Sequence, residues 1–468
     1  MDPFGCVKNQ VDAENMMACL DKAGWENSDA ETADLIIVNS CGFIESAKKE
    51  SINAVIGWRR LYPEKKILLA GCLAQRYAKE LAESLTEADG FFGIENISGI
   101  AKTAEKTCLT AAKNKPHVNH SLSKDEHTAS GERPLLSLPG SAYVKISEGC
   151  NNRCSFCAIP LIRGNLASRT IPDITEECRS LLARGIKELC IIGQDIGSFG
   201  TDTASGHINL PQLLNSISFI EGHFWVRLLY IHPDHFPVQI LDIMEKDKRF
   251  LPYFDIPFQH ASAKILEAMN RNGTAEKYLE LIKKIRARLP NAVIRSTFLL
   301  GSPGETEEDF KALLDFQEKA ELDWLGCFTY SREEGTPSFS MKGQVPKKTA
   351  ATRKQIIEER QIPITEKNMD RFTGQTLEVL IEEKINSPAA EEIFWLGRLY
   401  CQAPDIDGAA VIAGAAEIKL QLGDIVPCKV IARRGFDLEA RLLLTPGSHS
   451  AIINHARSGS PLSSTAQS

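Results

Sequence analysis

Six cysteines fall into two sets of three, and their thiols are the side chains of this sequence best suited to metal chemistry. The compact set, here called the loop cysteines, has the spacing Cys-x3-Cys-x2-Cys and consists of Cys150, Cys154 and Cys157. The dispersed set, here called the strand-end cysteines, consists of Cys6, Cys41 and Cys72. Thiolates are the usual ligands of iron–sulfur clusters. Three thiolates bind three irons of a four-iron cluster and leave the fourth open, so the sequence predicts two open iron sites.

The composition limits the class of protein to which this chain can belong. A length of 468 residues predicts about three domains of roughly 150 residues each. The chain is 43% hydrophobic and 25% charged, which is typical of a soluble globular protein. It has no apolar run near the roughly 20 residues of a membrane helix and no secretory signal. We therefore expect a cytoplasmic protein without a membrane partner, in which cysteines serve metal binding or catalysis rather than disulfides. Of its 13 cysteines, the seven outside the two sets lack ligand spacing and are expected to be structural.

The first 110 residues predict a Rossmann-like parallel α/β domain. The apolar runs 35–38 and 66–70 are typical of buried strands, and each is followed by a helical pattern. Ligands of such sheets bind at the carboxyl ends of the strands, where Cys41 and Cys72 stand. Cys6 has only five residues before it, and Asp2-Pro3 is a poor strand. We therefore expect the first strand to be truncated.

Residues 111–140 are polar and rich in proline, which predicts a linker. Residues 141–365 alternate strands with helices, and Thr306 with Asp309 indicates an N-terminal helix cap. Six strands are expected, at 142–146, 188–192, 225–231, 253–256, 292–300 and 324–330. Six strand–helix units predict a partial (β/α)6 TIM-like barrel, whose loops at the C-terminal rim carry function. The loop cysteines follow the first of these strands, which places them at that rim.

The C-terminal part of the chain changes to short β-like segments separated by Gly, Pro and Asp. This pattern predicts a small antiparallel β-barrel over residues 371–446. Residues 447–468 are rich in serine and predict a disordered tail. The barrel segment holds 8 Lys and Arg against 11 Asp and Glu. Because nucleic-acid binding needs a positive surface, this segment better suits a basic protein partner.

The loop cysteines offer three ligands, whereas a structural zinc site needs four. Their spacing, with Phe156 before the third cysteine, resembles that of the radical S-adenosylmethionine enzymes. The resemblance implies that the partial barrel holds a [4Fe-4S] cluster whose open iron binds S-adenosylmethionine. Electron transfer from the cluster would then generate a 5′-deoxyadenosyl radical, with the loop cysteines as catalytic ligands. It also implies that the turn with Gly301 and Glu305 helps to bind the adenine end of the cofactor, the alternative being a plain strand–helix connection. Phe156 is a further candidate for cofactor binding. Gln194 and Asp195, at another strand end, are candidates for contact with cofactor or substrate, with a structural role as the alternative.

The strand-end cysteines stand in the contexts Gly5-Cys6-x-x-Asn9-x-x-Asp12-x-Glu14, Asn39-Ser40-Cys41-Gly42-Phe43-Ile44 and Gly71-Cys72. These contexts resemble the N-terminal domain of the methylthiotransferases, a family of radical S-adenosylmethionine enzymes. The resemblance implies that the strand-end cysteines bind a second [4Fe-4S] cluster. The last domain resembles the TRAM module of the same family.

Four further stretches resemble the family branch that acts on ribosomal protein S-twelve. They are 41–47, 193–195, 255–260 and 403–408, and Gln194-Asp195 stands where the tRNA-modifying branch carries Gln-Asn. The resemblance implies addition of a methylthio group to the β-carbon of an aspartate in ribosomal protein S-twelve. It also implies an electron donor such as flavodoxin or ferredoxin, and RNA contact only when the protein is bound to the ribosome.

Two other functions remain open at this stage. The chain could be a tRNA adenosine methylthiotransferase, or a non-catalytic iron–sulfur sensor or scaffold. Arg227 and Arg295 lie on apolar strands, where a buried arginine needs an acidic partner, and binding of a substrate carboxylate is the alternative. His232 and His260 are interpreted as either site residues or ordinary polar residues at strand ends.

Overall fold

A computed structural model describes residues 1–109, 117–119, 132–203, 209–385, 392–415 and 418–443. The predicted tail 447–468 and most of the predicted linker lie outside these residues. None of the helices in the described part of the chain has the length and apolarity required to cross a membrane.

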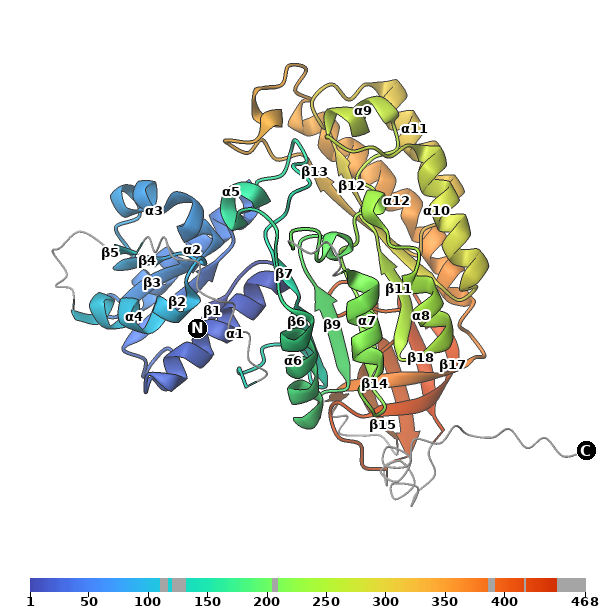
Figure 1. The fold of residues 1–468 in the computed structure, drawn as a ribbon, viewed down its shortest axis with the longest axis horizontal. Coiled ribbons are helices and arrows are strands. Elements are labelled where there is room, and N and C mark those ends of the chain that lie inside the picture. The colour runs from blue at the N-terminus through green and yellow to red at the C-terminus, as the bar shows by residue number, and fades with distance from the viewer. Residues whose placement is uncertain (110–116, 120–131, 204–208, 386–391, 416–417, 444–468) are drawn as a thin grey trace, which may run out of the picture.

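The N-terminal sheet contains five parallel strands in the order β1-β2-β3-β4-β5 (Figure 1). The strands are β1 (Asp2–Pro3), β2 (Leu35–Ser40), β3 (Lys66–Gly71), β4 (Gly90–Phe92) and β5 (His117–Asn119). The helices are α1 (Val7–Lys22), α2 (Glu45–Leu61), α3 (Cys72–Ser84) and α4 (Ile100–Leu109), with a 3-10 turn at Ile97–Gly99. The Rossmann-like α/β fold is therefore confirmed.

The N-terminal sheet has a short strand at each end. Ahead of Cys6, Asp2 and Pro3 pair in parallel with Val38 and Asn39 of β2. This strand has only two residues, which agrees with the expected truncation, and its pairing with β2 outweighs the low β propensity of Asp2-Pro3. The other short strand is β5, which the sequence did not predict; it lies within the predicted linker and pairs with β4.

The central sheet contains six parallel strands in the order β13-β12-β11-β10-β9-β6, which confirms the partial barrel. The strands are β6 (Ser141–Lys145), β9 (Glu188–Ile192), β10 (Trp225–Leu228), β11 (Phe250–Asp255), β12 (Val293–Leu300) and β13 (Trp324–Thr329). A two-stranded hairpin, β7 (Ser147–Glu148) with β8 (Ala167–Ser168), stands at the C-terminal end of β6.

Helices surround the central sheet on its outer face (Figure 1). They are α6 (Ile171–Ala183), α7 (Leu210–Ser218), α8 (Ile240–Lys246), α9 (Ala263–Ala268), α10 (Ala275–Arg288), α11 (Glu307–Ala320) and α12 (Lys347–Asp370). The short helix α5 (Ile159–Arg163) lies instead beside α3 of the N-terminal domain. Three 3-10 turns lie at Ile196–Ser198, Pro233–His235 and Pro337–Ser340. The cap predicted for α11 is present, with Thr306 and Asp309 bonded reciprocally.

The C-terminal domain is a closed five-stranded barrel in the order β14-β15-β16-β18-β17. Its strands are β14 (Thr376–Ile385), β15 (Glu392–Leu399), β16 (Ala410–Ala415), β17 (Ile425–Arg434) and β18 (Asp437–Leu442). All neighbours are antiparallel except β16 and β18, which pair in parallel. The predicted small barrel is therefore confirmed, with this one parallel pair as an exception.

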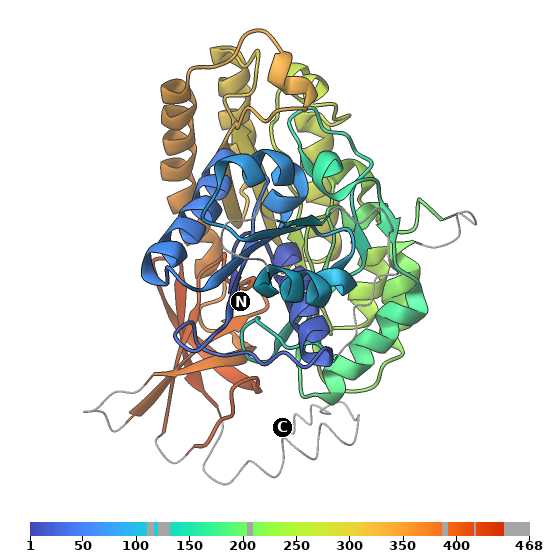
Figure 2. The same cartoon turned by 90° about the vertical axis from the view of Figure 1, so that its left-hand side faces the viewer.

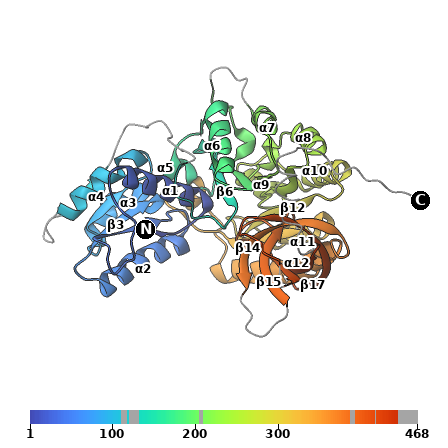
Figure 3. The same ribbon diagram turned by 90° about the horizontal axis from the view of Figure 1, so that it is seen from below.

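The three parts pack against one another through two different ends of the central sheet. The N-terminal sheet lies in front of the central sheet when viewed from its side (Figure 2), and α1 packs against β6. The small barrel lies at the lower end of the central sheet in Figure 1, and Figure 3 shows it from below. There Trp324 donates to the Cys401 carbonyl, and Arg398 pairs with Glu188 at the start of β9. The small barrel therefore contacts the end of the central sheet where the strands begin, and the N-terminal domain packs toward the C-terminal rim.

Candidate functional site

The loop cysteines follow β7 in a loop with two left-handed residues, Gly149 (φ +66°) and Arg153 (φ +49°). A Cβ on Gly149 would lie 2.1 Å from the Asn165 carbonyl oxygen, so only glycine fits there. The Cys150 N–H donates to the Gly164 carbonyl at 3.2 Å, and the Cys157 N–H donates to the Cys154 carbonyl at 3.0 Å. Backbone bonds thus hold all three thiols in one short loop at the barrel rim.

Burial suppresses ionisation of the loop cysteines. It raises the pKa of Cys150 to about 11 and that of Cys157 to about 12. Arg271 lies 4.0 Å from Cys154 Sγ and favours the thiolate, but burial still leaves the pKa of Cys154 raised. Thiols of this kind become strong ligands when a bound metal supplies the missing positive charge.

The strand-end cysteines meet at one edge of the N-terminal sheet, each directly after a strand or within a few residues of it. Cys6 lies between β1 and α1, Cys41 follows β2, and Cys72 begins α3 after β3. Asn9 links the three segments. Its side-chain amide donates to the Phe4 carbonyl at 2.6 Å and to the Ser40 carbonyl at 3.2 Å, and the Cys72 thiol donates to Asn9 Oδ1 at 3.5 Å.

The three thiols of this set differ in their electrostatic surroundings. Burial raises the pKa of Cys72 to about 12, although Arg163 opposes it. Desolvation also raises the pKa of Cys41. Cys6 is exposed, and although desolvation opposes its ionisation, Lys8 and Arg163 bring its pKa below the ordinary value. Two cations, Lys8 and Arg163, therefore lie near the strand-end cysteines and favour their thiolate forms.

A buried network of ion pairs joins the two cysteine sets. Arg163, on α5 just after the loop cysteines, donates to Cys72 Sγ at 3.2 Å and to Asp12 at 2.8 Å. The same guanidinium pairs with Glu148 at 3.0 Å, and Lys145 pairs with both Asp12 and Glu148. Apolar contacts of Cys72 with Ala158 and Ile162 accompany these pairs. The network fixes the strand-end cysteines against the loop that carries the other set.

A second ion cluster, which sequence reasoning missed, lies in the predicted linker. Arg133 is fully buried and pairs with Glu14 of α1 at 2.8 Å and with Glu177 of α6. Its guanidinium also donates to the Tyr143 carbonyl at 2.5 Å. Glu14, which belongs to the Cys6 motif, therefore has a structural role. In the sequence, the presence of Arg133 was the one feature that could have indicated this ion cluster.

Asp195 is buried at the end of β9 and holds several loops of the rim together. Its carboxylate accepts from Asn152 of the cysteine loop at 2.9 Å, from Ser198 at 2.6 Å and from the His232 N–H at 3.0 Å. It also contacts His235 Nδ1 at 2.9 Å. These contacts hold the pKa of Asp195 below its ordinary value despite burial. The neighbouring Gln194 is partly buried.

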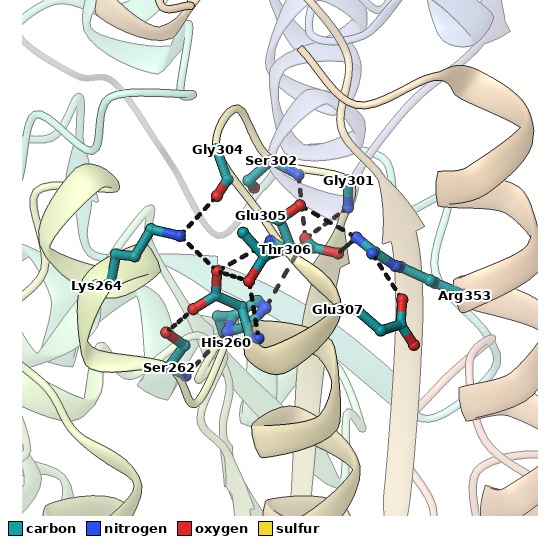
Figure 4. Close-up of polar contacts among 11 residues, drawn as sticks. His260, Ser262, Lys264, Gly301, Ser302, Gly304, Glu305, Thr306, Glu307 and Arg353 are labelled. Atoms are coloured by element: carbon teal, nitrogen blue, oxygen red, sulfur yellow. Dashed lines mark hydrogen bonds and ion pairs between the residues drawn. The ribbon is translucent and has the colours of Figure 1, made fainter. Parts of the chain in front are cut away.

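The Gly-rich turn after β12 is organised by Glu305 (Figure 4). One carboxylate oxygen of Glu305 accepts the backbone N–H groups of Gly301 at 2.7 Å and Ser302 at 3.2 Å. The other oxygen pairs with Arg353 at 2.7 Å. Gly301 has a positive φ of +79°, and a Cβ there would lie 2.4 Å from the Ala350 side chain. Glu305 therefore shapes the turn through its backbone.

The remaining candidates are two arginines, one phenylalanine and two histidines. Arg227 pairs with Glu188 at 2.7 Å and Arg295 pairs with Asp255 at 3.1 Å, so both buried arginines have acidic partners. Phe156 packs with an apolar group at the rim made of Ile265, Met269, Leu299 and Tyr330. His232 and His260 are buried, and within the described residues the Nε2 atom of each lacks a hydrogen bond.

The chemistry of the thiols fits iron–sulfur clusters. All 13 cysteines are free thiols. Among the described residues, no three His, Cys, Asp or Glu side chains surround a position for a single metal ion. A four-iron cluster does not require that arrangement, since each thiolate binds a different iron. Soft thiolate donors without carboxylate ligands favour such clusters.

Three family profiles match successive parts of the chain. Residues 1–93 match a family described as Uncharacterized protein family UPF0004, residues 144–316 match the Radical SAM superfamily, and residues 373–443 match the TRAM domain. A solved structure with a similar fold is the radical S-adenosylmethionine methyltransferase TsrM from Kitasatospora setae, with cobalamin and a [4Fe-4S] cluster bound. Its TM-score is 0.50 at 15% identity, and the match covers 70% of each chain.

Curated relatives match nearly the whole chain. A protein of Treponema denticola named ribosomal protein uS12 methylthiotransferase RimO is 48% identical over 466 residues, which cover 94% of this chain and 99% of the relative. A protein of the same name from Syntrophomonas wolfei is 41% identical, with 93% and 97% covered. This chain belongs to the RimO family of radical S-adenosylmethionine methylthiotransferases.

Proposed function

We propose that this chain adds a methylthio group to the β-carbon of an aspartate in ribosomal protein uS12. The observation that carries the proposal is the contact between Arg163, on the helix that follows the loop cysteines, and a thiol of the strand-end set. Arg163 lies six residues after Cys157 in sequence, and it donates to Cys72 of the other set at 3.2 Å. Because this contact holds the two cysteine-bearing segments together, the open irons of the two clusters can act on one bound substrate. The names and near-complete coverage of the curated relatives support uS12 as that substrate.

The two cysteine sets receive separate roles in this proposal. The loop cysteines are the ligands of one [4Fe-4S] cluster, whose open iron binds S-adenosylmethionine. The strand-end cysteines are the ligands of a second [4Fe-4S] cluster. When bound, these groups supply a carbon radical at the first set and a sulfur site at the second. An unactivated C–H bond has no acidic proton, so ordinary base catalysis is unsuitable and the cofactor carries the difficult step.

The protein's own residues position the reactants. Asp195 fixes the cysteine loop through Asn152, and the turn shaped by Glu305 supports the cofactor at the other side of the rim. Gln194, Gly301 and Phe156 are the further candidates for contact with S-adenosylmethionine. Arg163 and Lys145 hold the strand-end cysteines in register with the loop cysteines. Such positioning converts encounters between separate reactants into a reaction within one complex.

Two finer points complete the proposal. An external one-electron donor, such as a flavodoxin or a ferredoxin, reduces the cluster at the loop cysteines. The reaction takes place in the cytoplasm, where its ribosomal substrate is found. The acidic balance of residues 371–446 suits a basic ribosomal protein, and contact with RNA, for instance through Arg433 and Arg434, arises only on the ribosome.

Mass spectrometry of uS12 tests the proposed function. The protein is purified from cells that lack their own enzyme, with and without this chain. A gain equal to one methylthio group on an aspartate, dependent on this chain, supports the proposal. An unmodified uS12 together with methylthio-adenosine in tRNA would assign the chain to the tRNA reaction instead. An unmodified uS12 without cofactor cleavage would support a non-catalytic sensor or scaffold.

A further inference from the structure

Lys8 is a buried cation whose charge the network described above does not use. It lies in the first turn of α1, two residues after Cys6, and only 6% of its surface is exposed. Its ammonium lies 3.1 Å from the centre of the Tyr230 ring. Within the described residues, the ammonium makes no hydrogen bond and lies within 4.0 Å of no carboxylate. Buried lysines without an acidic partner are uncommon, because desolvation of the charge is costly.

The neighbouring cations are all paired, which sets Lys8 apart. Lys145 and Arg163 share Asp12 and Glu148. Arg295, on the facing strand β12, pairs with Asp255 at 3.1 Å. The nearby carboxylates are therefore paired with other side chains, and the direct contact of the Lys8 ammonium is with the face of the Tyr230 ring. A cation on an aromatic face keeps its donors available for a further anionic partner.

The position of Lys8 lies between the two parts of the site. Lys8 belongs to the helix that follows Cys6, whereas Tyr230 follows β10 at the C-terminal rim of the central sheet. Tyr230 has a left-handed backbone (φ +68°), and its carbonyl accepts from the Ile196 N–H at 3.0 Å. A non-glycine residue held in this conformation costs free energy and persists where the surroundings enforce it. The ring is thus fixed beneath the ammonium.

We propose that Lys8 binds the side-chain carboxylate of the substrate aspartate. This inference rests on the proposed function, since the carbon to be modified is bonded directly to that carboxylate. A substrate carboxylate brought between the two cysteine sets loses its water and needs a cationic partner there. Among the cations next to the strand-end cysteines, Lys8 can receive it without breaking an ion pair between described residues, whereas Lys145 and Arg163 are already paired with Asp12 and Glu148. An adenine base carries no such charge, so the same lysine favours an aspartate over an adenosine substrate.

Binding of matched peptides tests the inference directly. The full chain with both clusters loaded is titrated with fluorescent peptides that span the modified aspartate of uS12, carrying either Asp or Asn at that position. We expect the unmodified enzyme to bind the Asp peptide at least about tenfold more tightly, as is typical of a hydrogen bond between charged groups. Lys8→Met should abolish that preference. Lys22→Met, an exposed lysine at the end of the same helix, should retain it.

Further readouts separate the alternatives. In Lys8→Arg the charge remains, so a partial preference for the Asp peptide should persist even if the shape of the site changes. The Lys8→Met protein could keep the full preference for the Asp peptide and change only the reduction potential of the second cluster. Lys8 would then tune the cluster rather than bind the substrate, and the inference would be overturned. If product forms normally while the preference is independent of Lys8, only this inference fails. If the preference depends on Lys8 but no methylthio product forms, the proposed function fails and the carboxylate site stands.

Discussion

The guanidinium of Arg163 lies 3.2 Å from Cys72 Sγ, so a residue of the central barrel contacts a thiol of the N-terminal domain. Hydrogen bonds and positive charge near cluster sulfurs are among the factors that set a cluster's reduction potential. We expect Arg163→Met to lower the potential of the cluster at the strand-end cysteines by roughly 60 mV, the equivalent of about 1.4 kcal/mol for one electron. A redox titration followed by electron paramagnetic resonance measures this shift.

The control for this experiment is Arg179→Met, because Arg179 is an exposed arginine of the same domain whose ion pair with Glu176 lies at the surface. It should leave both potentials unchanged. An Arg163→Met protein that keeps both clusters at their original potentials would show that the contact with Cys72 has no electrostatic effect on the cluster.

Arg133 should contribute strongly to stability although it lies in a segment without regular structure. Its guanidinium is fully buried between Glu14 and Glu177, so its removal leaves two buried carboxylates without this partner. Breaking a buried ion pair from one side typically costs about 3–5 kcal/mol. We expect Arg133→Met to lower the free energy of unfolding by that amount in a denaturant titration. A loss no greater than that of Arg179→Met would contradict this account of the interface.

The sequence predicted the fold well where hydrophobic periodicity is strong. The runs 35–38 and 188–192 are buried strands, and the spacing of strands and helices predicted the six-stranded partial barrel. It failed where tertiary contacts override local preference. Asp2-Pro3 is a poor strand alone, and the β5 segment 117–119 is too short and polar to be recognised, yet both pair with a neighbouring strand.

The chemistry of the site was predictable only as far as residue types and spacing carry it. The spacing and contexts of the six cysteines singled them out, and the structure places one set at strand ends and the other in one loop, whereas their role as cluster ligands stays a prediction. The roles of Asp12, Lys145 and Arg163 could not be found, because the partners of a charged side chain depend on how the domains dock. For the same reason, the sequence could not show that the Glu305 carboxylate accepts from the backbone of its turn and pairs with Arg353, and its part in cofactor binding stays a prediction.

Glu305 should affect cofactor binding through the shape of its turn (Figure 4). Glu305→Gln removes the charge that holds the Gly301 and Ser302 N–H groups and Arg353. We expect the KM for S-adenosylmethionine to rise about tenfold with little change in kcat, since hydrogen bonds to a charged group are worth about 1.5–3 kcal/mol. Glu307→Gln is the matched control, because Glu307 is exposed and contacts the same Arg353. Equal effects of the two substitutions would refute the positioning role.

Asp407 should make the stability of the protein depend on pH. It lies between the small barrel and the central sheet, where it accepts from the Tyr253 hydroxyl at 2.6 Å and from the Ala403 N–H at 2.8 Å. Burial raises the pKa of Asp407 from 3.8 to about 6. The folded state therefore binds the proton more tightly than the unfolded state. Stability from this group is present below pH 4 and is lost as the pH rises to about 6.

Asp407→Asn removes that titration while keeping an oxygen acceptor. The free energy of unfolding of the variant minus that of the unmodified protein should rise by roughly 2–3 kcal/mol between pH 4 and pH 6 and then level off. Chemical denaturation at several pH values measures it. The exposed neighbour Asp405 provides the control substitution, Asp405→Asn, which should show no such step. If the difference in the free energy of unfolding does not change between pH 4 and pH 6, Asp407 does not titrate in this range and the prediction is wrong.

The separate roles of the two cysteine sets are the central claim of this account. They are tested by measuring 5′-deoxyadenosine and methylthio-modified uS12 in the same reaction for Cys154→Ala, Cys41→Ala and the control Cys19→Ala. We expect Cys154→Ala to form neither product, Cys41→Ala to form 5′-deoxyadenosine without modified uS12, and Cys19→Ala to form both. Modified uS12 from the Cys41→Ala protein, or 5′-deoxyadenosine from the Cys154→Ala protein, would contradict the assignment.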